Sequence, residues 1–126
     1  MSHSPTQGPR EPGVQVFTQI EKRWLREQIF HAVDLAGVDL TAADLRDSRF
    51  EGVSLRGSDF RAADLRGVQF IDCDLRGAWF GEALLGANHF QGSCLAGAVG
   101  LSEEQAGYIR MRGGRFSDPG DPSPAA

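Results

Sequence analysis

The sequence predicts one all-β solenoid in which the chain winds into stacked, four-sided coils. Two observations predict it. Every fifth position from 30 to 95 is Leu or Phe, although these two types make up only 19 of 126 residues. A helix has a hydrophobic period of 3.6 and a half-buried strand a period of 2, so a period of five fits neither. Residues 20 apart also match, as in the row Phe30, Phe50, Phe70 and Phe90. Four five-residue sides per coil explain both periods.

Each five-residue side is predicted to have an inward centre, a second inward residue and a corner. The residue two before the centre is small or β-branched except at Asn88, and strand alternation points it inward as well. The residue two after the centre is mostly Gly or Ala, which tolerate the backbone of a turn, with the exceptions Asp47, Asp72 and Glu82. Stacked coils then pair their backbones at roughly 4.7–4.9 Å, the spacing of strands.

Six segments resemble the repeats of the pentapeptide-repeat family, whose pattern is A-[D/N]-L-x-x. They are VDLAG (33–37), VDLTA (38–42), ADLRD (43–47), SDFRA (58–62), ADLRG (63–67) and CDLRG (73–77). AGAVGLSEEQ (96–105) also resembles a common end of such arrays. The resemblance implies a right-handed quadrilateral β-helix, here of about 3.5–4 coils over residues 30–101.

The ends of a solenoid need caps, because its core is exposed there. Phe17, Ile20 and Trp24 have helical spacing and predict an N-terminal capping helix over 14–29. Ile20 and Leu25 also keep the five-residue register, but Arg23 would then point inward, which favours the helix. Ser102 and Gln105 resemble a capping box and predict a second capping helix over 102–112. The tails, 1–13 and 113–126, are rich in Pro, Gly and Ser and are expected to be disordered.

Composition restricts the function classes. The net charge is −4, so the basic surface of a nucleic-acid-binding protein is absent and no direct nucleic-acid binding is expected. No apolar run approaches the roughly 18 residues of a membrane span, and the N-terminus has no apolar signal region. Cys73 and Cys94 form no CxxC pair and are expected to be free thiols. Together these features indicate a soluble cytoplasmic protein.

No catalytic, cofactor or metal site is predicted, and the chain is not expected to be an enzyme. A solenoid packed with Leu and Phe leaves no pocket for convergent polar groups. His3, His31 and His89 lack metal-ligand spacing and are interpreted as solvated. Cys73 occupies an inward small position, which favours a packed thiol over a reactive one.

Charged residues fill the outward positions. Four D-x-R units occur, and an Asp can meet its own Arg or the Arg of the next coil, because residues two apart share a face. One interpretation is a solubilising ladder worth about 0–1 kcal/mol per pair. The other is a docking stripe for a protein partner, made by Arg46, Arg56, Arg61, Arg66 and Arg76.

One outward patch is apolar instead. Trp79 stands one coil beyond Asp59, Val99 one coil beyond Trp79, and Leu84 takes the same kind of position on the next side. Exposed apolar patches mark interfaces, so these residues are candidates for partner binding or for homodimerisation through the C-terminal half. The alternative is that the C-terminal helix covers them.

Two functions remain open. The first is a non-catalytic interaction or structural module that presents flat solenoid faces to an unidentified protein. The second, implied by the family resemblance, is a DNA mimic that binds DNA gyrase or topoisomerase IV and protects it from quinolone-type poisons. Residues 30–101 carry ten acidic residues against six Arg. DNA carries about 10 charges over the predicted length of roughly 17 Å, so this net of −4 favours the first.

Overall fold

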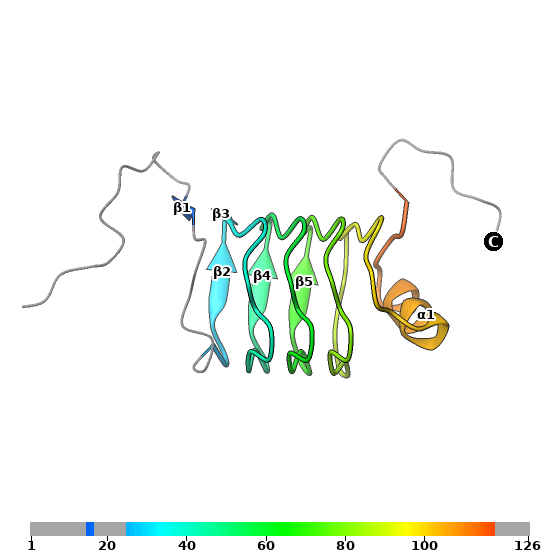
Figure 1. The fold of residues 1–126 in the computed structure, drawn as a ribbon. Helices are drawn as coiled ribbons and strands as arrows, with labels where there is room; N and C mark the ends of the chain where they lie inside the picture. Colours follow the sequence, from blue (N-terminus) through cyan, green and yellow to red (C-terminus); the bar gives the residue numbers. More distant parts are fainter. Residues whose placement is uncertain (1–14, 17–24, 118–126) are drawn as a thin grey trace, which may run out of the picture.

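A computed structural model describes residues 25–117, together with the backbone of residues 15–16. The described chain forms a column of stacked coils with one helix at its C-terminal end (Figure 1). Its named elements are β1 (Gln15–Val16), β2 (Ile29–His31), β3 (Val33–Asp34), β4 (Arg49–Glu51), β5 (Gln69–Ile71) and α1 (Glu103–Met111). All strand pairs are parallel: β1 pairs with β3, and a second sheet has the order β2-β4-β5.

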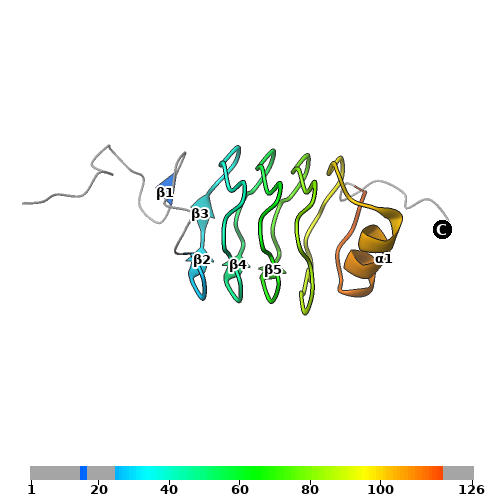
Figure 2. The ribbon, with the colours of Figure 1, turned by 60° about the horizontal axis from the view of Figure 1, so that its bottom comes forward.

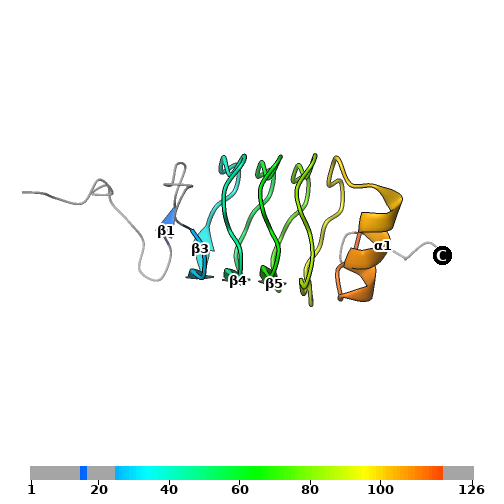
Figure 3. The same ribbon diagram turned by 90° about the horizontal axis from the view of Figure 1, so that it is seen from below.

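The pairing register gives the coil a length of 20 residues. Phe30 pairs with Phe50, and Phe50 with Phe70. The other sides pair in the same step through isolated bridges, for example Asp44 with Asp64. Successive coils therefore lie side by side along one axis, with β2, β4 and β5 on a common side (Figures 2 and 3). The predicted stacking of like positions is confirmed.

A left-handed backbone turns every corner. The residue two after each centre, from 27 to 97, has a positive φ, whether it is glycine or not. Gly67 has φ 78°, and Ala62 in the preceding side has φ 61°. An L-residue pays roughly 1–2 kcal/mol for this conformation, which is why small residues and Gly dominate the position. The non-glycine corners are Glu27, Ala32, Ala42, Asp47, Ala62, Asp72, Glu82 and Ala87.

The centres form buried columns inside the coils. Phe50, Phe60, Phe70, Phe80 and Phe90 are fully buried, as are the Leu centres other than Leu25 and Leu85. The rings stack at the coil spacing, with centroids 5.3 Å apart for Phe50 and Phe70 and 5.2 Å for Phe70 and Phe90. Such aromatic pairs stabilise by about 0.5–1.5 kcal/mol beyond the area they bury.

Polar side chains at the smaller inward positions are satisfied by backbone carbonyls. Ser58 Oγ donates to the Leu35 carbonyl at 3.1 Å, and Ser93 Oγ donates to the Phe70 carbonyl at 2.9 Å. Cys73 follows the same rule, because its Sγ donates to the Phe50 carbonyl at 3.3 Å. No buried side-chain nitrogen or oxygen among the described residues lacks a partner, so the array tolerates these polar atoms.

The N-terminal capping helix expected over 14–29 is wrong wherever the structure describes that range. Residues 15–16 form strand β1, and β2 begins at Ile29. Glu27 has φ 60° and donates its N–H to the Arg46 carbonyl at 3.0 Å, as a corner residue does. Leu25 packs against the core as a centre would. Backbone pairing to the next coil therefore orders residues 25–29, while residues 17–24, which carry the helical spacing, lie outside the described part.

The C-terminal helix lies within its predicted range. Ser102 is the N-cap of α1, and its reciprocal hydrogen bonds with Gln105 form the expected capping box. Ile109 is fully buried in the core cluster, so the helix packs on the last coil.

Residues 113–117 are not the disordered start of a tail. The chain returns to the solenoid after α1, where Arg115 bridges to Cys94 and Leu95 N–H donates to the Arg115 carbonyl at 2.6 Å. Unpaired backbone at the end of the last coil explains this return, since those groups need partners. Residues 1–13 and 118–126 lie outside the described part.

Candidate interaction surface

Carboxylate–guanidinium pairs cover the outer faces of the middle coils. In each D-x-R unit the Arg binds the Asp two residues earlier through two parallel hydrogen bonds. For Asp64 and Arg66 the Nε–Oδ1 and Nη2–Oδ2 distances are 2.8 and 2.6 Å. The Arg66 backbone N–H donates to the same carboxylate at 3.2 Å. The same arrangement occurs at Asp44/Arg46, Asp59/Arg61 and Asp74/Arg76.

The pairs are also linked between coils. Arg46 Nε lies 3.6 Å from Asp64 Oδ2, and Arg56 Nε lies 3.8 Å from Asp74 Oδ2. Asp64 and Asp74 thus meet an Arg of the preceding coil, whereas the sequence suggested the following one. The reason is that the Arg side chain extends toward the C-terminal end of the column, where the next carboxylate stands.

These contacts shift the acidity of the carboxyl groups. The Arg46 side chain hydrogen-bonds Asp44 and lowers the pKa of Asp44 to about 2. The Arg partners likewise lower the pKa of Asp59, Asp64 and Asp74 through their side-chain hydrogen bonds. The five Arg residues that the sequence singled out are therefore mostly engaged with neighbouring carboxylates, and the faces that they cover are close to neutral in local charge.

The late apolar surface, defined as Trp79, Leu84 and Val99, is exposed. Their exposed fractions are 45%, 50% and 46%. Trp79 bridges to Val99 and replaces the carboxylate of Asp59 one coil earlier. Helix α1 leaves all three side chains open to solvent, so the structure rejects the alternative in which the helix covers them.

Arg61 belongs to this surface as well as to the ladder. Its guanidinium carbon lies 5.1 Å from the centre of the Trp79 ring, in a cation–π contact. At exposed sites such a contact contributes about 0.5–1 kcal/mol. It holds the indole against the solenoid wall, which presents a preformed aromatic face beside a positive charge.

The remaining reactive side chains carry no assembled chemistry. Cys73 is buried, and burial raises the pKa of its thiol to about 11. His31 Nδ1 lies 3.5 Å from Glu51 Oε1, His89 is exposed, and His3 lies outside the described residues. Across residues 25–117 no group of His, Cys, Asp and Glu side chains has the arrangement of a metal site. Nor does this part contain a helix with the length and apolarity to span a bilayer.

The structure adds one feature that the sequence did not reveal. Asn88, the exception among the small inward residues, is fully buried, and its backbone N–H donates to Tyr108 Oη of α1 at 2.8 Å. Its Nδ2 donates to the carbonyls of Leu65 and Val68 at 2.6 and 2.8 Å. The sequence signalled Asn88 through its departure from the small-residue rule. It did not show that Tyr108 of α1 is the hydrogen-bond partner of Asn88.

Coils of 20 residues with left-handed corners define a class of repeat solenoids, built from five-residue units. A family model described as a pentapeptide repeat region matches residues 21–99. The chain belongs to the pentapeptide-repeat family. This match starts before residue 30, in agreement with the corner at Glu27.

Solved structures with similar folds include a pentapeptide repeat protein of the Arabidopsis thaliana thylakoid lumen. It is 22% identical over 83% of each chain, with a TM-score of 0.43. Another is full-length QnrB1, a plasmid-mediated fluoroquinolone resistance protein, 16% identical over 68% of this chain and 45% of that one, with a TM-score of 0.37. A trypsin-treated form of QnrB1 is 15% identical over 68% and 71%, with a TM-score of 0.34. These likenesses concern the fold alone. No curated protein matches the chain.

Proposed function

We propose that this chain is a non-catalytic protein–protein interaction module whose docking surface is the late apolar surface. The observation that carries the proposal is the exposure of Trp79, Leu84 and Val99 at outward positions of two neighbouring sides, which earlier coils fill with Asp. Apolar side chains exposed together in this way gain free energy when a partner covers them. Aromatic residues with an adjacent Arg are also the side chains that most often dominate the energy of an interface.

The outer faces that carry the Asp–Arg pairs give the module its specificity. Asp and Arg pairs around the late apolar surface keep the solenoid soluble and near neutral, so they do not attract every charged macromolecule. A partner that buries Trp79 must also accommodate Arg61 and Asp59, whose hydrogen bonds fix their positions. Preorganised groups lose little freedom on binding, which favours one geometry of docking.

A second candidate is binding to a type II topoisomerase. Family membership and the acidic excess of ten carboxylates against six Arg over 30–101 favour it, and QnrB1 is described as a fluoroquinolone resistance protein. The Arg ladder opposes it, because a mimic of DNA needs unneutralised carboxylates along the rod. A gyrase supercoiling assay with and without a quinolone distinguishes the two. We expect no effect; protection or inhibition at stoichiometric protein would replace the first candidate.

The test of the proposed function is affinity capture from the native cell with three baits. Wild-type protein and Ile29→Arg, which places the same charge at a distant exposed position, are expected to retain one common partner. Trp79→Arg is expected to lose it, because the new charge cannot be buried beside Arg61. Equal capture by all three baits would refute the surface. Light scattering of the purified protein shows whether the partner is a second copy.

A further inference from the structure

The strand edge formed by residues 83–87 differs from the same edge one coil earlier. In that earlier coil the edge is fully paired. The Ala63 carbonyl accepts from Leu84 N–H at 2.9 Å, Leu65 N–H donates to the Leu84 carbonyl at 2.9 Å, and Gly67 N–H donates to the Gly86 carbonyl at 2.7 Å. Three backbone groups thus define how the next strand must bind.

One coil later the corresponding three groups have no such strand. The Ala83 carbonyl, Leu85 N–H and Ala87 N–H form no hydrogen bond with any part of the chain that the structure describes. The next two sides, with their centres at Phe90 and Leu95, are covered by returning chain. Phe90 N–H donates to the Arg112 carbonyl, and Leu95 N–H donates to the Arg115 carbonyl. Next to residues 83–87, where the following coil would lie, the chain instead forms α1, which supplies side chains but no paired strand.

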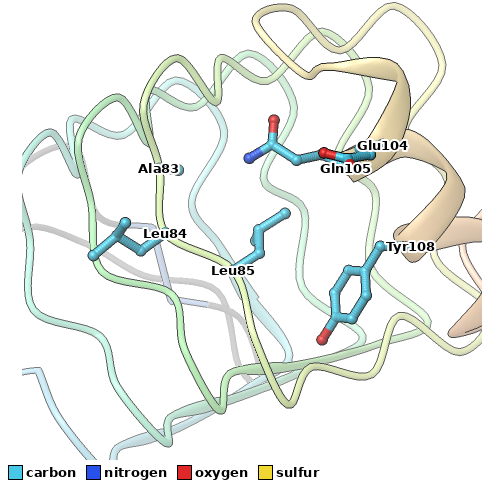
Figure 4. A pocket seen from close by; sticks show the side chains of 6 residues that line it. All are labelled: Ala83, Leu84, Leu85, Glu104, Gln105 and Tyr108. Carbon is cyan, nitrogen blue, oxygen red and sulfur yellow. The ribbon is translucent and has the colours of Figure 1, made fainter.

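An open groove separates this edge from α1. Its lining comprises Ala83, Leu84 and Leu85 on the strand and Glu104, Gln105 and Tyr108 on the helix, and its volume is about 410 Å³. Figure 4 shows Leu85 in the space between strand and helix, with Gln105 and Tyr108 on the far side. Leu85 is a centre that stays only partly buried, whereas Leu45 and Leu65 in the same column are fully buried. The column therefore lacks its next apolar residue.

Unpaired carboxylates lie at the groove or next to its lining in the chain: Glu104 lines it, Glu82 precedes the lining residue Ala83, and Glu103 precedes Glu104. Glu82, Glu103 and Glu104 are exposed, and none of them forms an ion pair within the described residues. The carboxylates of the Asp–Arg ladder, in contrast, are bound by their Arg partners. A ligand with Lys or Arg side chains is thus favoured beside these carboxylates.

We propose that the edge at residues 83–87 binds an extended, basic segment of a partner protein, which adds one parallel strand between the last coil and α1. The segment donates one N–H to the Ala83 carbonyl and accepts from Leu85 and Ala87 N–H. An apolar residue of the segment covers Leu85, and a small residue covers Ala83, because both positions point inward. Its Lys or Arg residues face Glu82 and Glu104. This strand addition rests on the proposed function as an interaction module and names the chemistry of the ligand.

The test uses the full chain and the peptide acetyl-Lys-Lys-Ala-Val-Leu-Lys-Gly-amide, whose residues follow this pattern. Amide hydrogen exchange by NMR is the readout. In the free protein the amides of Leu85 and Ala87 are expected to exchange much faster than those of Leu65 and Gly67. Saturating peptide is expected to protect both. A peptide with Glu in place of each Lys is expected to bind at least about tenfold more weakly.

Matched variants separate charge from fold. The double variant Glu82→Gln, Glu104→Gln is expected to weaken peptide binding about tenfold at low salt, because the peptide loses two ion-pair partners. Glu27→Gln with Glu51→Gln removes the same charge elsewhere and is expected to leave binding unchanged. Binding without protection of Leu85 and Ala87, absence of binding, or equal binding of the acidic peptide would each overturn the inference. The proposed function fails separately, through the Trp79→Arg bait.

Discussion

The backbone N–H of Asn88 donates to the hydroxyl of Tyr108 at 2.8 Å, and this bond joins the corner at Ala87 to the terminal helix. At an ordinary corner the same N–H bonds back across the corner, as Val38 N–H does to the Leu35 carbonyl at 3.1 Å. Here the corner is reshaped, because Asn88 Oδ1 accepts from Gly86 N–H at 2.7 Å. The guanidinium of Arg112 lies over the Tyr108 ring at 5.0 Å and completes the junction.

Tyr108→Phe is expected to destabilise the protein by about 1–2 kcal/mol, because the Asn88 N–H loses its acceptor. For a chain of this size the melting temperature should fall by several degrees. Met111→Ala, at an exposed position of the same helix, is the control and should be nearly silent. Equal melting temperatures for Tyr108→Phe and wild type would show that solvent replaces the hydroxyl without cost.

Phe70→Asp is expected to unfold the protein. The ring is fully buried between Phe50 and Phe90, and a carboxylate there has no partner, so the loss should exceed about 4 kcal/mol. Gln69→Asp, one residue earlier on the outer face, should change stability by less than about 0.5 kcal/mol. Thermal melts followed by circular dichroism compare the two. Similar losses would contradict the assignment of inward and outward positions.

Ala62→Gly is expected to stabilise the protein. Ala62 has φ 61°, and Gly relieves left-handed strain of roughly 1–2 kcal/mol while the unfolded chain gains entropy worth about 0.4–1 kcal/mol. The net gain should be about 0.5–1 kcal/mol. Ala63→Gly, at the adjacent buried position, should instead lower stability. Urea denaturation of both variants measures the difference, and a loss for Ala62→Gly would mean that the corner is not strained.

Asp44 should titrate far below its usual range. Its pKa is about 2 in the folded protein against 3.8 ordinarily, so the unfolded chain binds the proton more tightly. The stabilisation is therefore complete above pH 3.8 and is lost as the pH falls toward 2. Arg46→Met should return the pKa of Asp44 toward 3.8 in an NMR titration of the carboxyl carbon. Arg76→Met, which removes the partner of Asp74 instead, should leave Asp44 unchanged.

The core of the fold could be predicted because the same five-residue pattern of inward residues recurs along the chain. Centres such as Leu45 and Phe70 recur every five residues, and only a structure with a corner in each side can bury all of them. The corner at Asp47 extends the pattern to a residue other than Gly or Ala, since it holds the same place in the register and has the same left-handed backbone, with φ 63°. A local pattern repeated over many sides determines the coil, because every copy favours the same stacking.

The ends could not be predicted in the same way. Helical spacing around Trp24 suggested a helix, but the corner at Glu27 pairs with the next coil, and no local pattern shows how much backbone pairing is available. Residues 113–117 looked like tail by composition, yet the exposed edge of the last coil provides the partners that order them. At residues 25–29 and 113–117, backbone pairing between residues far apart in the chain outweighs the local preference.

The sequence by itself determined the 20-residue coil, the columns that fill it and the apolar residues at 79, 84 and 99. Tertiary structure alone decided that α1 leaves those residues exposed, that Tyr108 binds Asn88, and that the edge at 83–87 keeps its backbone groups unpaired. The physical reason is that repeated short-range patterns specify how like coils stack. Where the repeat ends, the direction of one helix sets which groups are covered, and that direction depends on contacts between residues far apart in the chain.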